Sequence, residues 1–199
     1  MPNLLQRIWL NHLIWKCERS HKKWLKAESR SRNEKRRSEL KMDFIGISED
    51  RLHHIIGVAR KAYKIAKEEG NDENFCRKMF MLGWIHDVGY EFSLTQEEHA
   101  AIPSELLYQL YAYNCKDIYG ADVSIKTNYA MCYHGRCPDE SLKYNKEWRI
   151  LTTADMLVDG KGKEVSAFDR LEDIKERYGE NSEQYLIAHD TCQIIGLIN

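Results

Sequence analysis

The chain has 199 residues, of which 43% are apolar and 31% are charged, and its net charge is −1. This length suits one domain with an appendage, and the composition is typical of a water-soluble globular protein. No apolar run approaches the roughly 20 residues that cross a bilayer, and the N-terminus lacks the features of a secretory signal. We therefore expect no membrane span and a cytoplasmic location.

The charge is divided unevenly along the chain. Residues 1–41 contain 12 Lys and Arg against 4 Asp and Glu, a net charge of +8, whereas residues 42–199 contain 18 against 27, or −9. Three interpretations of residues 1–41 stay open: a basic amphipathic helix that binds a membrane surface or nucleic acid, a packing helix, or an extension of a natural protein that begins at Met42. We predict a basic extension at 1–41 and a functional domain at 42–199.

Helix signals begin at Ser48, which can cap a helix that Gly70 ends, so we expect a helix at about 49–69. A second is expected at about 72–88, with Gly89 as its stop, and its apolar second half predicts burial. A capping box at 95–98 and Pro103 then favour a helix that reaches Tyr113. The remaining expected helices lie at about 122–133, 146–157, 167–178 and 182–197. This pattern predicts an all-α fold.

The six cysteines form no C-x-x-C pair, so free thiols are expected. Cys132 and Cys137 flank His134, and a thiolate zinc site is the alternative.

The buried helix expected at 72–88 ends in His86 and Asp87, although burying ionisable groups is costly unless they are paired. A helix cap or salt bridge would explain the pair, and so would a metal ion, because imidazole nitrogen and carboxylate oxygen suit Fe, Mn, Co, Ni or Zn. His54 and Asp155 are also polar residues on stretches that should face the core.

Three stretches resemble the signature blocks of the HD-domain phosphohydrolase superfamily, in the same order: RLHHIIGVARKAYKIA, MLGWIHDVGYEF and ILTTADML. The resemblance covers about residues 48–158 and implies an HD-domain helical bundle. It implies that His54, His86, Asp87 and Asp155 bind metal, with His54 preferred to His53 because it stands four residues before Val58-Ala59.

His99 and His134 match the additional ligands of members that hold two ions, including a subgroup that cleaves symmetric dinucleoside tetraphosphates. The implied cofactor is one or two divalent ions (Fe, Mn, Co, Ni, Mg or Zn), with Asp87 as the catalytic residue that bridges two ions. A second His-Asp pair, His189-Asp190, has no matching blocks around it and is expected to be a surface feature.

The function that these residues predict is metal-dependent hydrolysis of a phosphate ester or anhydride in a small nucleotide-like substrate. Arg51, Arg136 and Lys161 are the candidates for holding its phosphate groups. Where many members have Lys, this chain has Tyr90, which supplies no fixed positive charge. Two alternatives stay open: a metal-retaining module that senses a nucleotide, and oxidative chemistry at a di-iron centre. Nucleic acid would be a partner only through residues 1–41.

Overall fold

The computed structural model describes residues 47–91, 99–100, 103–104 and 124–199, together with residues 12, 15, 16, 19, 22 and 23. The chain divides into two units, Met1–Ile45 and Gly46–Asn199. In the first unit, the described residues are helical, and Trp15 stacks on His12 with the Arg19 guanidinium 5.2 Å from its ring centroid. Whether the functional domain begins at Met42 stays a prediction.

The second unit is all-α in its described part, as predicted. Its α-helices are α2 (Glu49–Glu68), α3 (Glu73–Ile85), α5 (Ile125–Cys132), α6 (Lys146–Met156), α7 (Ala167–Tyr178) and α8 (Glu183–Ile194), and two short 3-10 helices are η1 (Val88–Glu91) and η2 (Glu140–Tyr144). An isolated antiparallel bridge joins Val158 to Glu164. No described helix has both the length and the apolarity that a membrane span requires.

The caps explain where most of these helices begin. The Ser48 side chain accepts from the Arg51 N–H at the start of α2, as predicted, and Gly70 follows α2 with a φ of 76°. Asn145 caps α6, and Ser166 caps α7 in a capping box with Asp169. Because these side chains satisfy backbone donors that the first turn leaves open, local sequence predicts these starts well.

Three predicted helices are clearly longer than those observed. The helix expected at about 122–133 begins at Ile125, because Ser124 caps it, and ends at Cys132. The helix expected at about 72–88 ends at Ile85, because the His86 ring contacts the Gly83 carbonyl (2.7 Å) and the chain turns there before η1. The last ends at Ile194 rather than residue 197, where the Leu197 N–H donates back to the Cys192 carbonyl (2.9 Å). The predicted capping box at 95–98 lies outside the described residues. So does the helix predicted from Pro103 to Tyr113, apart from residues 103 and 104, which are helical.

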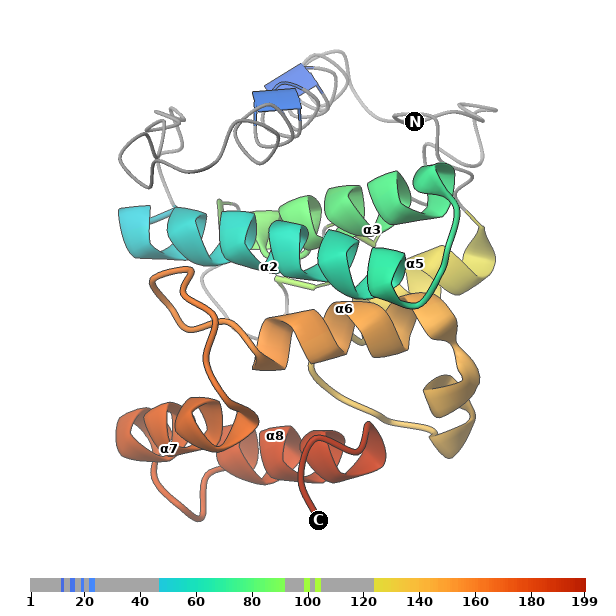
Figure 1. Ribbon diagram of the computed structural model, residues 1–199. Helices are drawn as coiled ribbons and strands as arrows, with labels where there is room; N and C mark the ends of the chain where they lie inside the picture. The colour runs from blue at the N-terminus through green and yellow to red at the C-terminus, as the bar shows by residue number, and fades with distance from the viewer. Residues whose placement is uncertain are drawn as a thin grey trace. The chain divides into compact units, whose positions relative to one another are not determined.

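The helices form a layered arrangement in which α6 lies between the α2–α3 pair and the α7–α8 pair (Figure 1). The α2–α3 contact is close, because a Cβ added at Gly83 would lie 2.6 Å from Ala59 Cα. Trp84 and Trp148 are fully buried in the core. A smaller apolar cluster, which includes Met156, Ile174 and Ala188, joins α6 to the α7–α8 pair. The described cysteines, Cys76, Cys132, Cys137 and Cys192, are free thiols, as expected.

Candidate metal centre

The six side chains for which the sequence predicted metal binding converge on one point of the second unit. They are supplied by α2, the turn after α3, the turn at residue 99, the turn after α5, and α6: His54, His86, Asp87, His99, His134 and Asp155. Their ligand atoms include two mutually close groups, His54–His86–Asp155 and His86–Asp87–His134, in each of which all atoms lie within 4.8 Å of one another. Neither group includes Cys132 or Cys137, so the thiolate zinc alternative gains no support from the described residues.

The Asp87 carboxylate is the hub of this cluster. Its Oδ1 lies 3.3 Å from His99 Nε2 and 3.6 Å from His134 Nε2. Its Oδ2 lies 3.4 Å from His86 Nε2 and 2.6 Å from Arg51 Nη1. On the far side of the cluster, His54 Nε2 lies 2.9 Å from Asp155 Oδ1. Four imidazoles and one guanidinium therefore surround two carboxylates.

Backbone carbonyls orient three of the imidazoles. The Nδ1 atoms of His54, His86 and His134 lie 3.0, 2.7 and 2.7 Å from the carbonyl oxygens of Asp159, Gly83 and Met131. A carbonyl only accepts, so each Nδ1 carries the proton, and in the neutral ring the lone pair is on Nε2. All three Nε2 atoms thus face the carboxylates, which is the arrangement that second-shell contacts impose on metal-binding histidines.

His86 Nε2 is buried and has no hydrogen-bond partner among the described residues. A buried polar nitrogen without a partner costs about 1–3 kcal/mol. A neutral imidazole would also point its lone pair at the Asp87 carboxylate, which is unfavourable unless a proton or a cation lies between them. The environment of this one atom therefore favours a positive charge between the ring and Asp87, which either a proton or a metal cation can supply.

The electrostatics of the cluster keep both carboxylates ionised. Burial alone would raise the pKa of Asp87, which is 3% exposed, but His86, His134 and Arg51 hold that pKa well below its ordinary value. Burial likewise acts to raise the pKa of Asp155, and His54, His86 and Arg170 lower it. Burial acts to lower the pKa of His86, whereas the charges of Asp87 and Asp155 raise it overall. The surrounding positive groups thus favour the charged form of both carboxylates, of which Asp87 is buried and Asp155 partly exposed.

Tyr90, where the chain departs from the sequence pattern that it resembles, lies in a stack between Arg51 and His99. The Arg51 guanidinium lies 4.4 Å from the Tyr90 ring centroid, and the Tyr90 and His99 rings stack at 4.3 Å with an angle of 12°. A guanidinium above an aromatic face is attracted to the ring quadrupole. Tyr90 carries no positive charge itself, but it packs against the Arg51 side chain that brings one to Asp87.

The loop after α6 positions His54. The Asp159 carbonyl contacts the His54 ring, while the Asp159 carboxylate accepts from the backbone N–H groups of Lys161 (2.9 Å) and Lys163 (2.8 Å). The sequence suggested Lys161 as a phosphate ligand, but its exposed side chain does not line the pocket described next. Gly162 has a φ of 76°, and a Cβ there would lie 2.2 Å from the His53 carbonyl oxygen.

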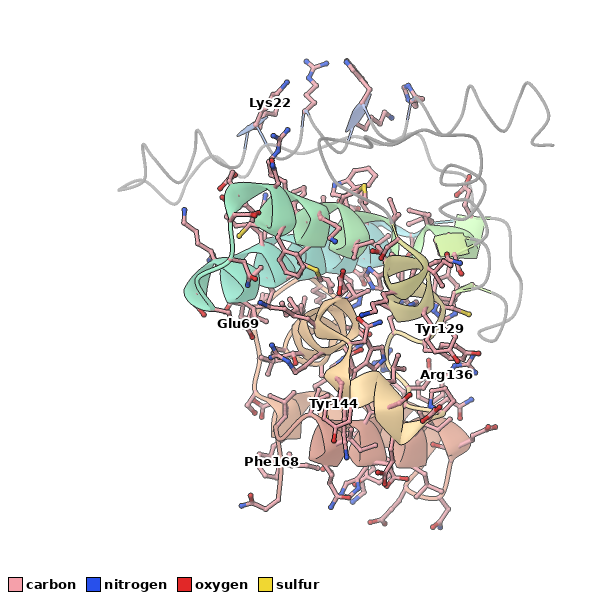
Figure 2. The ribbon with its side chains drawn as sticks, turned by 90° about the vertical axis from the view of Figure 1, so that its right-hand side faces the viewer. Lys22, Glu69, Tyr129, Arg136, Tyr144 and Phe168 are labelled. Atoms are coloured by element: carbon pink, nitrogen blue, oxygen red, sulfur yellow. The ribbon has the colours of Figure 1, made fainter. Side chains whose placement is uncertain are left out.

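A pocket of about 370 Å³ opens from the cluster toward the α7–α8 pair. Asp87, His99, His134 and Asp155 line its inner end, at the cluster, and the sequence-predicted Arg51 and Arg136 are also lining residues. Figure 2 shows Arg136 on the flank between α5 and the α7–α8 pair. Two further arginines, Arg170 and Arg177 of α7, line the pocket and were missed from the sequence. The sequence signal that could have found these two arginines is their position next to the apolar face of an amphipathic helix.

The second His-Asp pair lies apart from the cluster. His189 and Asp190 are in the middle of α8, and their side chains are 37% and 74% exposed. As expected, this pair is a surface feature, so it offers an internal control for experiments on His86 and Asp87.

We expect Gly162→Ala to destabilise the protein by about 1–3 kcal/mol, because the new methyl group would overlap the His53 backbone and strain a left-handed residue. Gly160→Ala is the matched control in the same loop, since a Cβ there meets nothing within 4 Å, and its effect should stay within about 0.5 kcal/mol. Urea denaturation measures both. Equal midpoints for the two variants would contradict this account of the loop.

The chain thus brings buried nitrogen and oxygen ligands together beside a pocket lined by arginines. Comparisons with protein-family models, with curated proteins and with solved structures found no match.

Proposed function

We propose that this protein is a metal-dependent phosphohydrolase of the HD type, which acts on a phosphate ester or anhydride of a nucleotide-like substrate. The observation that carries the proposal is the buried set of imidazoles whose Nε2 atoms face Asp87 and Asp155, with His86 Nε2 left without a hydrogen-bond partner in the described part of the chain. The resemblance of the three sequence blocks to the HD superfamily supports the same assignment.

The donor set fits a divalent transition metal. Imidazole nitrogens and carboxylate oxygens suit Fe, Mn, Co, Ni and Zn. His54, His86 and Asp155 would hold one ion, and Asp87 and His134 would complete the set, with His99 available if a second ion binds. A bound divalent ion lowers the pKa of a water ligand toward neutrality and polarises a phosphoryl oxygen.

The protein's own groups would bind and orient the phosphate. Arg51 offers a guanidinium beside Asp87, and planar guanidinium groups bind phosphate oxygens in pairs. Arg136 lines the same pocket, and its backbone carbonyl accepts from the buried Trp148 indole N–H (3.1 Å). The pocket is lined by four arginines against three carboxylates, two of which belong to the proposed metal ligands. A site with this charge pattern favours an anionic substrate.

The same charge pattern bears on the two alternatives. A di-iron centre for oxidative chemistry needs no set of arginines, so a phosphorylated substrate fits the pocket better. A regulatory module would bind such a substrate without turning it over. Turnover that continues without oxygen separates the proposal from both.

We expect Asp87→Asn to lower metal-dependent hydrolysis by at least about 10²-fold, because one substituted electrostatic group at a reaction centre has an effect of this size. Asp190→Asn, the same change in the exposed His-Asp pair, should retain wild-type activity. The assay uses nucleoside mono-, di- and triphosphates and p-nitrophenyl phosphate, with protein loaded in turn with Mn²⁺, Fe²⁺, Co²⁺, Ni²⁺ or Zn²⁺. A wild-type protein that hydrolyses none of them, with any of these metals, would end the proposal.

Arg51→Met should lower kcat/KM by about 10-fold to 10²-fold, the loss of one charge-assisted contact worth about 1.5–3 kcal/mol. Tyr90→Leu should cause a smaller loss, because it removes the ring against which Arg51 packs, while Tyr90→Phe keeps the ring and should stay near wild type. Steady-state kinetics on the best substrate of the panel distinguishes these variants. If Tyr90→Phe is as impaired as Tyr90→Leu, the hydroxyl group, and not the stack, is what matters.

A further inference from the structure

The pocket is larger than a single phosphate group at the metal centre would need. Beyond Asp87 and Asp155 it continues along α7 and α8, over a floor that includes Met156, Ile174 and Ala188. The Thr191 hydroxyl of α8 lies 3.4 Å from the Gly135 carbonyl, so the α7–α8 pair is attached to the turn that carries His134 and Arg136. This contact connects the helices that line the outer part of the pocket to the turn that carries His134.

One face of α7 supplies the charge of this outer part. Arg170, Ile174 and Arg177 occupy positions i, i+4 and i+7, which share a face of an α-helix, and all three line the pocket. At 1.5 Å per residue, the two arginines are about 10 Å apart along the helix axis. Their guanidinium groups approach each other because both donate to the same carboxylate oxygen, Asp173 Oδ2.

The two arginines compete for one acceptor. Both guanidinium groups donate to the single carboxylate of Asp173, and Glu183 of α8 is the other carboxylate beside them that lines the pocket. The Arg170 side chain is only 11% exposed, and its Nε is buried without a hydrogen-bond partner among the described residues. A buried donor on a charged group is costly unless an acceptor reaches it. A phosphate oxygen is an acceptor of the required charge.

We propose that Arg170 and Arg177 form a distal anion subsite, which selects substrates carrying at least two linked phosphate groups. The proposal rests on the phosphohydrolase function, because it places the reacting phosphate near Asp87 and the next phosphate of the chain over α7. A monoester would occupy the inner end alone and leave the outer arginines unused. The positive groups from Arg51 and Arg136 to Arg170 and Arg177 thus match an extended anion.

Arg177→Gln tests the subsite, because Arg177 is 42% exposed and substitutions at such positions rarely unfold a protein. Lys175→Gln removes one positive charge from the same helix outside the pocket and is the matched control. Arg177→Lys keeps the positive charge but lacks the planar guanidinium group that can bind two phosphate oxygens at once. Thermal unfolding of each full-length variant confirms that it is folded.

The first readout is binding of inorganic tripolyphosphate and orthophosphate to the full chain without added metal, by isothermal titration calorimetry. Arg177→Gln should weaken tripolyphosphate binding at least 10-fold and orthophosphate binding much less, with Arg177→Lys intermediate and Lys175→Gln unchanged. The basic residues 1–41 also attract polyphosphate, but they are the same in every variant. Equal tripolyphosphate binding by Arg177→Gln and Lys175→Gln would overturn the proposal.

The second readout is hydrolysis of the triphosphate and the monophosphate of one nucleoside by metal-loaded protein. The ratio of the two kcat/KM values should fall at least 10-fold in Arg177→Gln and stay constant in Lys175→Gln. If hydrolysis occurs but this ratio does not change, the subsite is wrong and the phosphohydrolase function stands. If tripolyphosphate binding depends on Arg177 but no phosphate compound is hydrolysed, the function fails and the subsite stands.

Discussion

The Asp87 carboxylate carries a full charge in a place that water hardly reaches, and the groups around it must compensate for that burial. Arg51 lies 2.6 Å from one of its oxygens, and imidazoles of His86, His99 and His134 lie within 3.6 Å of the two oxygens. Removing one partner from a buried charge cluster typically costs several kcal/mol. This requirement makes α2, the turn after α3 and the turn after α5 meet at one point.

Contacts with backbone carbonyls fix the orientation of three imidazole rings. His86 and His134 each contact the carbonyl three residues earlier, in the turn that ends their own helix. Those carbonyls are among the groups that a helix end leaves unsatisfied, so one contact both ends the helix and fixes the ring. His54 lies inside α2 and not at a helix end. Its ring instead contacts the backbone carbonyl of Asp159, 105 residues away in sequence. The loop that begins at Asp159 therefore helps to orient the His54 ring.

Local sequence signals predicted much of this fold. The cap at Ser48 was predicted, and the bounds predicted for α7, 167–178, are those observed, where Ser166 caps the helix by contacts to residues close to it in sequence. The choice of His54 over His53 agrees with the structure, in which His54 is buried and His53 exposed. The six clustered residues were found because each is a polar group on an apolar stretch, or lies where the chain resembles the HD superfamily.

Other features depend on contacts between distant parts of the chain, and sequence reasoning missed them. The stack of Arg51 on Tyr90 joins residues on separate elements, so no spacing rule predicts it. Lys161 was chosen as a positive residue in the loop after Asp155, but the backbone N–H groups of that loop donate to the Asp159 carboxylate, and the Lys161 side chain is exposed. Arg170 and Arg177 resemble ordinary surface residues of an amphipathic helix until the packing of α7 and α8 places them beside the pocket.

The central claim is that a cation belongs between His86 Nε2 and the buried carboxylates. Anomalous X-ray diffraction from crystals of the full chain grown with Mn²⁺ tests it most directly. The account predicts an anomalous peak at ligand distance, about 2 Å, from His86 Nε2 and from an oxygen of Asp87 or Asp155. Crystals that bind Mn²⁺ only elsewhere, or not at all, with His86 Nε2 bonded to a protein acceptor or a water molecule, would contradict it.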